Sequence, residues 1–176
     1  MNRTNTLPSS DSGTELRLPS NPNIYADKTT VGTGVFATRD LPPTSWILTV
    51  EGPTLSGEHP VTDLDEQGIL LQTGVNEYIT PKPPASLLNH SCEPNAGFVK
   101  DQHLVAIRPI SAGDEIRFDY STTMDEDNWT LDCQCEAPSC RGIIGDFADL
   151  PEDRRQEYLD LGIVPSFIAR QYRSGI

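Results

Sequence analysis

Short alternations of apolar and polar residues follow one another along the middle of the chain. The stretch "DEIRFDY" at 114–120 alternates polar and apolar residues, and short segments at 47–50, 75–79, 97–99 and 103–106 are plausible strands. A period of two is typical of a half-buried strand. The Gly and Pro residues between these runs mark turns, such as the one expected at Pro109–Gly113. The pattern therefore predicts a chain of short β-strands rather than a helical bundle.

The segment "TTVGTGVFATRDLPPTSWILTVEG" predicts a strand, a tight glycine turn, a second strand, a loop and a third strand. Within it Gly32 and Gly34 flank Thr33. Glycines spaced in this way let a ligand approach the backbone closely. Taken alone, the G-x-G is equally consistent with a simple hairpin.

The two ends of the chain have a different pattern. "LPEDRRQEYLDLG" carries Pro151 near a helix start, acidic residues in the first turn and Gly162 just beyond the end, which predicts a helix. A second short helix is expected from about Ser166. Residues 1–22 are rich in Ser, Thr, Asn and Pro, and we expect a disordered tail there.

Composition narrows the class of protein. At 176 residues and 19.4 kDa the chain has the size of one domain, and its 15 prolines and 13 glycines fit short strands with many turns. No apolar run approaches the roughly 18 residues of a membrane span, and the N-terminus lacks the apolar stretch of a signal peptide. We therefore expect no membrane partner and an intracellular protein, cytoplasmic or nuclear.

The net charge is −13 and the isoelectric point is about 4.4. Because phosphates would repel such a chain, direct binding to nucleic acid is not expected. The acidic residues are concentrated between Ser121 and Asp160, a segment that contains eleven Asp or Glu residues and three arginines. This segment fits either a solvated acidic surface or a surface that attracts a Lys- and Arg-rich partner.

All four cysteines of the chain fall into one pattern. Cys133, Cys135 and Cys140 form a C-x-C-x4-C cluster, and Cys92 lies about forty residues upstream. Four thiolates suit tetrahedral zinc, and a zinc with four sulfur ligands has no open position for water, so it would be structural. Two disulfides, or four unrelated reduced cysteines, remain as alternatives at this point.

Three motifs occur in a fixed order: "GTGVFATRDL", then "LLNHSCEPN", then "AGDEIRFDYST" followed by "CQCEAPSCRG". In this order and spacing the chain resembles the SET-domain lysine methyltransferases that carry a post-SET zinc module, over about residues 25–144. The resemblance implies a mainly β fold, the β-clip of small curved sheets with a C-terminal pseudoknot. It places a SET domain at 23–124, a post-SET zinc-binding segment at 125–145 and a C-terminal helical extension at 146–176.

The resemblance also implies roles for individual residues. It assigns the binding of S-adenosylmethionine to Gly32, Thr33, Gly34, Asn89 and His90. Zinc would be bound by Cys92, Cys133, Cys135 and Cys140. Asn89 could instead satisfy backbone groups, and His90 could be a buried structural histidine.

Tyr120 would be the catalytic tyrosine. Phe118 lies two residues before it, on the same face of a strand, at a position that influences how many methyl groups are added in this family. Phenylalanine there leaves space, which implies competence beyond one methyl group. Either aromatic residue could also be simple core packing.

Methyl transfer to lysine requires a neutral amine in line with the sulfonium. Lysine has a pKa near 10.4, so only about one in 2,500 is deprotonated at pH 7, and holding it neutral costs about 4.6 kcal/mol. A dry aromatic channel and a nearby sulfonium charge both lower the pKa of that lysine. A strong base is then not needed, and alignment by Tyr120 supplies much of the rate.

We therefore predict a methyltransferase that uses S-adenosylmethionine to methylate lysine in a basic protein or peptide, with a structural zinc. Two alternatives remain. Val50 and Pro53 stand where the family commonly has other residues, so the same cofactor could serve a small-molecule substrate. A degenerate SET module that only binds a partner would also explain those two departures.

Overall fold

The computed structural model describes residues 16–17, 21–57, 70–126 and 129–173. The expected tail at 1–22 lies outside these residues except for 16–17, 21 and 22. At the start of the described core, Asn21 is buried and its side-chain amide donates a hydrogen bond to the carbonyl of Ile47. This bond ties the entry of the chain to the middle of the fold.

The largest sheet brings together parts of the chain that are far apart in sequence. Its order is β1 (Leu16–Arg17), β2 (Ile24–Thr29), β3 (Gly32–Ala37), β11 (Glu115–Phe118) and β8 (Asn89–His90). The first four strands pair antiparallel, whereas β11 pairs parallel with β8, Arg117 opposite Asn89 and Phe118 opposite His90. The motifs "NHSC" and "DEIRFDY" therefore lie side by side.

Three smaller sheets complete the fold. They are β4–β10–β9, with bounds Trp46–Thr49, His103–Ala106 and Ala96–Val99; β5–β7–β6, with bounds Thr54–Ser56, Glu77–Ile79 and Leu71–Gly74; and β12–β13, with bounds Thr130–Asp132 and Ile143–Gly145. The predicted mainly β class with small sheets is confirmed. The sequence analysis did not predict β5 or β6.

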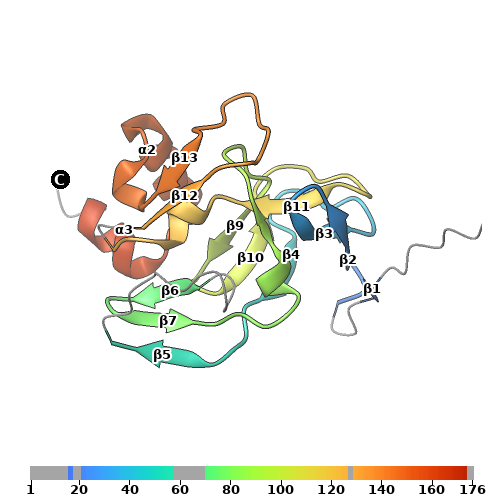
Figure 1. The fold of residues 1–176 in the computed structure, drawn as a ribbon, viewed down its shortest axis with the longest axis horizontal. Coiled ribbons are helices and arrows are strands. Elements are labelled where there is room, and N and C mark those ends of the chain that lie inside the picture. The colour runs from blue at the N-terminus through green and yellow to red at the C-terminus, as the bar shows by residue number, and fades with distance from the viewer. Residues whose placement is uncertain (1–15, 18–20, 58–69, 127–128, 174–176) are drawn as a thin grey trace, which may run out of the picture.

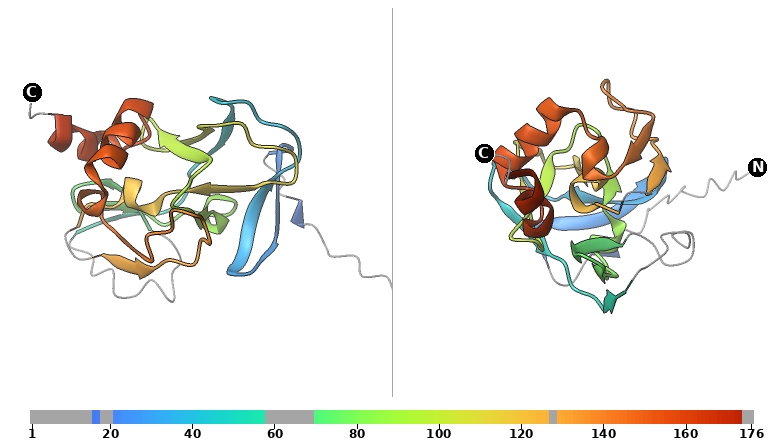
Figure 2. Two further views of the ribbon diagram at one scale, coloured as in Figure 1. Left: turned by 90° about the horizontal axis from the view of Figure 1, so that it is seen from above. Right: turned by 90° about the vertical axis from the view of Figure 1, so that its left-hand side faces the viewer.

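The helices are short and lie late in the chain. Among the described residues three are single 3-10 turns, η2 (Ala85–Leu87), η3 (Tyr120–Thr123) and η4 (Phe147–Asp149), and two are α-helices, α2 (Glu152–Leu161) and α3 (Ser166–Arg173). As predicted, Pro151 precedes α2, and Gly162 ends it in the left-handed conformation with φ of 68°. Figures 1 and 2 show α2 and α3 at the end of the molecule opposite β1, β2 and β3.

The core has two parts. The larger cluster fills the space between the sheets and includes Phe98, Ile116 and Phe118, while the smaller one is formed by η4, α2 and α3. The two meet at Gly97, where a Cβ atom would lie 2.7 Å from the side chain of Ile163. Only glycine allows the C-terminal helices to approach β9 this closely.

The segment that links β11 to the helices runs through η3 and the β12–β13 hairpin, and η3 contacts both β13 and η4. The predicted boundaries at 124/125 and 145/146 fall in this connected region and stay predictions. Within the described ranges, none of the helices combines the length and the hydropathy needed to cross a bilayer.

Candidate functional site

Tyr120, Asn89 and His90 converge where β8 and β11 end. The backbone N–H of Tyr120 donates to Nδ1 of His90 at 3.2 Å, and the two rings meet edge to face with centroids 5.2 Å apart. The Tyr120 hydroxyl donates to the carbonyl of Leu88 at 2.7 Å. Residues thirty positions apart are thus held as one unit by the parallel pairing of their strands.

Tyr120 is 9% exposed. Burial, and then the negative charge of Glu115, raise the pKa of its hydroxyl well above 10. The phenol therefore stays protonated at neutral pH and acts as a hydrogen-bond donor. This agrees with a chemistry in which the tyrosine orients a substrate rather than removing its proton.

Phe118 lies behind Tyr120 in an aromatic cluster. Its ring centroid is 4.9 Å from that of Tyr120 and 5.0 Å from that of Phe98, and both phenylalanines are almost fully buried. Such offset and edge contacts fix ring positions as well as excluding water. Phe118 is thus placed to support Tyr120 from the core side.

Asn89 is oriented by two acceptors. Its side-chain amide donates to Oε1 of Glu115 at 2.7 Å and to the carbonyl of Thr33 at 3.3 Å. A Cβ on Gly34 would collide with the same Glu115 oxygen. The second glycine of the G-x-G is therefore required so that Glu115 can reach Asn89.

A cavity of about 410 Å³ opens beside these residues. Its walls come from the β2–β3 turn, from β8 and β11, and from the cysteine-rich segment; they are Thr29, Thr30, Val31, Asn89, His90, Glu115, Arg117, Tyr120, Leu131, Asp132, Cys133, Gln134, Cys135, Glu136 and Ile144. The volume is in the range of small-molecule sites. Thr30 and Val31, which line the cavity, form the turn of the hairpin, and Gly32, Thr33 and Gly34 follow them in β3.

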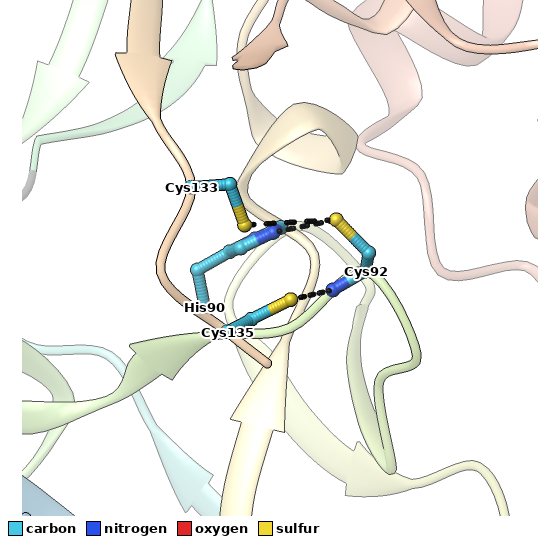
Figure 3. Close-up of side chains that lie close together, drawn as sticks. All are labelled: His90, Cys92, Cys133 and Cys135. Atoms are coloured by element: carbon cyan, nitrogen blue, oxygen red, sulfur yellow. Dashed lines mark hydrogen bonds between the residues drawn. The ribbon is translucent and has the colours of Figure 1, made fainter. Parts of the chain in front are cut away.

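Three of the four cysteines, Cys92, Cys133 and Cys135, lie close together around the ring of His90 (Figure 3). The sulfur atoms of Cys92 and Cys133 are 3.8 Å apart, and the donor atoms of Cys92, Cys133, Cys135 and His90 all lie within 4.8 Å of one another. A tetrahedral zinc with bonds of roughly 2.3 Å has ligand edges of about 3.8 Å. All four cysteines are free thiols, so the disulfide alternative is not the arrangement found.

His90 belongs to this cluster but is not suited to bind the metal. Its Nδ1 accepts the N–H of Tyr120, so in a neutral imidazole the proton is on Nε2, which lies 3.3 Å from the sulfur of Cys92. Burial lowers the pKa of His90 to about 4, against the raising effect of Asp119. The neutral ring therefore donates to the Cys92 sulfur rather than offering a lone pair.

Cys140 lies at the exposed side of the cluster. It is not part of the group of four donor atoms that lie within 4.8 Å of one another, but its thiol is close enough to raise the pKa of Cys133 and to lower that of Cys135. Burial raises the pKa of Cys135, but backbone N–H groups of Cys92 and Ala137 and the thiols of Cys133 and Cys140 lower it to about 7. Donors gathered around a sulfur in this way favour the thiolate form that zinc binds.

Glu136 completes the tight turn between Cys135 and Cys140 with a φ of 55°. This left-handed conformation favours glycine, and a glutamate adopts it at a cost of about 1 kcal/mol or more. The geometry of the cysteine cluster holds the residue there.

Asp119 is the charged centre behind the site. Its carboxylate has no exposed side-chain surface and accepts two bonds from the Arg141 guanidinium, at 2.6 and 2.7 Å, and one from the Tyr158 hydroxyl at 3.0 Å. Arg141 follows Cys140 directly, and its backbone N–H donates to the sulfur of Cys92 at 3.4 Å. The one carboxylate thus joins β11, the cysteine cluster and α2.

The structure brings together Asn89, His90, Phe118, Tyr120 and the cysteine-rich segment, whose functional roles stay predictions. The sequence analysis did not single out Glu115, Arg117, Asp119 or Arg141. Glu115 and Asp119 were visible as acids within the apolar alternation of "DEIRFDY". Nothing in the local sequence around Arg141 indicated its role, because its partner Asp119 is 22 residues away.

Comparison with protein families matches residues 32–121 to the SET domain. Among curated relatives, histone-lysine N-methyltransferase 2D of Homo sapiens is 27% identical over 143 residues, and the H3 lysine-36 specific histone-lysine N-methyltransferase of Kluyveromyces lactis is 33% identical over 155 residues. The matches cover 72% and 77% of this chain but only 3% and 22% of those relatives.

A solved structure, that of a candidate histone methyltransferase from Plasmodium falciparum, is also similar. It is 25% identical, and the match has a TM-score of 0.44 and covers 56% of this chain and 92% of the other.

The Asp119 contacts predict a stability effect for Tyr158→Phe. Removing the hydroxyl deletes one bond to a buried carboxylate, so the free energy of unfolding should fall by about 2 kcal/mol, as measured by urea titration. Tyr25→Phe is the matched control, because the Tyr25 hydroxyl makes no hydrogen bond with a described residue; its effect should stay within about 0.5 kcal/mol. Equal costs for the two variants would contradict the role given to Asp119.

Proposed function

The chain belongs to the SET domain family, and on that basis we propose that it is a methyltransferase that uses S-adenosylmethionine to methylate the side-chain amine of lysine in a protein. The observation that carries the proposal is the position of Tyr120, which lines one cavity with Asn89, His90 and the cysteine-rich segment. The names of the relatives specify lysine in histones, which supports a protein substrate.

S-adenosylmethionine supplies a methyl group on a sulfonium. Asn89 and His90 line the cavity and are both oriented by hydrogen bonds, so they are preorganised to hold such a molecule. Gly32, Thr33 and Gly34 would contribute from behind the β2–β3 turn, through the Thr33 carbonyl that fixes Asn89. Thr30 and Val31 supply the wall itself.

Tyr120 would orient the amine through its hydroxyl oxygen, which can accept an amine N–H while the hydroxyl proton is donated to the carbonyl of Leu88. The buried rings of Phe118 and Phe98 keep water away from its inner face, and a dry surrounding lowers the pKa of a lysine amine. Phe118 carries no hydroxyl that could hold a water beside the amine. We therefore propose that more than one methyl group can be added.

Zinc would be bound by Cys92, Cys133, Cys135 and Cys140. The 3.8 Å edge between Cys92 and Cys133 fits tetrahedral thiolate coordination, and the protonated Nε2 of His90 leaves Cys140 as the fourth ligand. Such a centre would be structural, cross-linking the 130–145 segment to the strand end at Cys92. The need for reduced thiols fits an intracellular location, cytoplasmic or nuclear.

The acidic character of the chain supports a basic substrate segment. With a net charge of −13, a Lys- and Arg-rich peptide would be attracted to the surface and would bind at an increased rate. Histone tails have this composition.

Transfer of a radiolabelled methyl group to a whole-cell protein extract tests the function. Radiolabel that is recovered in the protein fraction, and that protease treatment removes from it, supports the proposal. Label only in small molecules would favour the small-molecule enzyme, and no binding of S-adenosylmethionine by calorimetry would favour the non-catalytic module.

Tyr120→Phe should lower the rate of methyl transfer at least about a hundredfold, because only the hydroxyl that orients the amine is lost. Affinity for S-adenosylmethionine, followed by calorimetry, should change little. The control is Tyr25→Phe, on the far strand β2. A Tyr120→Phe rate within twofold of the wild type would remove the catalytic assignment.

Zinc content separates the two candidates for the fourth ligand. Cys140→Ser should reduce the metal in reduced, dialysed protein below about half an equivalent, because a thiolate ligand is lost. His90→Gln should retain about one equivalent, since an amide can still donate to the Cys92 sulfur. Metal analysis with the reverse result would make His90 the ligand and Cys140 a bystander.

A further inference from the structure

We propose that Arg117 and Glu115 form the subsite for the amino-acid end of the methyl donor, Arg117 receiving its carboxylate and Glu115 its ammonium. The inference rests on the proposed function, because it assumes that the cavity beside Tyr120 holds S-adenosylmethionine. It assigns Arg117 and Glu115 to a task that Asn89 and His90 cannot perform, since those two side chains are both neutral.

Arg117 is the one lysine or arginine among the described residues that line the cavity. The carboxylate is the only negative charge of the donor. A guanidinium binds a carboxylate through parallel, charge-assisted hydrogen bonds, which are about twice as strong as neutral ones. The single cation of the cavity is therefore matched to the single anion of the ligand.

The Arg117 side chain is held in place by contacts that leave some of its hydrogen-bond donors free. One terminal nitrogen donates to the carbonyl of Cys135 at 3.2 Å, and Nε lies 3.7 Å from the Glu115 carboxylate. The other terminal nitrogen forms no hydrogen bond with any part of the chain that the structure describes. A guanidinium has five N–H donors, so it keeps an edge free toward the cavity.

Glu115 precedes Arg117 by two residues on β11, so both side chains project from the same face of the sheet. One Glu115 oxygen accepts from Asn89 at 2.7 Å, and the other is the oxygen near Arg117. Because a carboxylate offers about four acceptor positions, it can still bind an ammonium. The pair presents opposite charges 3.7 Å apart, as does a ligand that carries both groups on one carbon.

The remaining charges argue against a phosphate-bearing nucleotide as the ligand. Asp132 and Glu136 also line the cavity, so acids outnumber the one arginine. A polyphosphate would be repelled, whereas S-adenosylmethionine, with a sulfonium, an ammonium and a carboxylate, is net positive. The charge pattern therefore fits a cationic donor with one anionic end.

Calorimetry on the full, zinc-loaded chain tests the subsite with three probes. They are S-adenosylmethionine, decarboxylated S-adenosylmethionine, which lacks only the carboxylate, and methylthioadenosine, a neutral thioether that lacks the carboxylate, the ammonium and the sulfonium charge. The wild type should bind S-adenosylmethionine at least about tenfold more tightly than the decarboxylated form. In Arg117→Gln this ratio should fall to about one, while affinity for methylthioadenosine changes less than about twofold.

Glu115→Gln should weaken both ligands that carry the ammonium and leave methylthioadenosine unaffected, since glutamine can still accept from Asn89. Arg39→Gln, outside the cavity, is the matched control and should keep the wild-type ratio. If Arg117→Gln does not fold, the proposal is tested by the ratio of affinities for S-adenosylmethionine and its decarboxylated form, measured in the wild type and in Arg117→Lys.

Equal wild-type affinities for the first two probes, or a ratio unchanged in Arg117→Gln, would overturn the subsite and leave the proposed function intact. No binding of S-adenosylmethionine to the wild type would instead overturn the proposed function.

Discussion

The buried ion pair of Asp119 and Arg141 is the contact on which the candidate site depends. The carboxylate is fully enclosed, and its charge is tolerated because the Arg141 guanidinium, the Tyr158 hydroxyl and the backbone N–H of Ser121 donate to it. Losing one partner of such a pair typically costs about 3–5 kcal/mol, because the other charge is left buried. The pair therefore acts as a constraint: the chain after Cys140 must return to the end of β11.

That return gives the cavity its third wall. Arg141 sits between Cys140 and the β13 strand, and its backbone also donates to the sulfur of Cys92, so the charge pair and the cysteine cluster fix the same loop twice. Residues 131–136 then close over Asn89, His90 and Tyr120. Tyr158 extends the constraint to α2, which explains why the C-terminal helices pack against the core and not away from it.

More of the candidate site's own residues could be predicted from the sequence than of the contacts that hold those residues in place. "NHSC", "DEIRFDY" and the cysteine spacing were recognisable because each is a short motif whose residues occur in a fixed order. The mainly β fold was predicted from the alternation of apolar and polar residues, and the two C-terminal helices from local signals such as Pro151 and Gly162. The links from Asp119 to Arg141 and from Asn89 to Glu115 could not be predicted, because they span 22 and 26 residues and depend on strand pairing. The cavity lining includes Thr30 and Val31 of the adjoining turn, and the assignment of cofactor binding to Gly32, Thr33 and Gly34 stays a prediction.

The most direct test of the account is the affinity for S-adenosylmethionine before and after zinc is withdrawn with a chelator. If the metal-fixed 130–145 segment completes the cavity, calorimetry should show a loss of at least about tenfold, recovered when zinc is restored, while circular dichroism shows that the sheets remain folded. Affinity that is unchanged in metal-free, folded protein would contradict the claim that this segment forms part of the binding site.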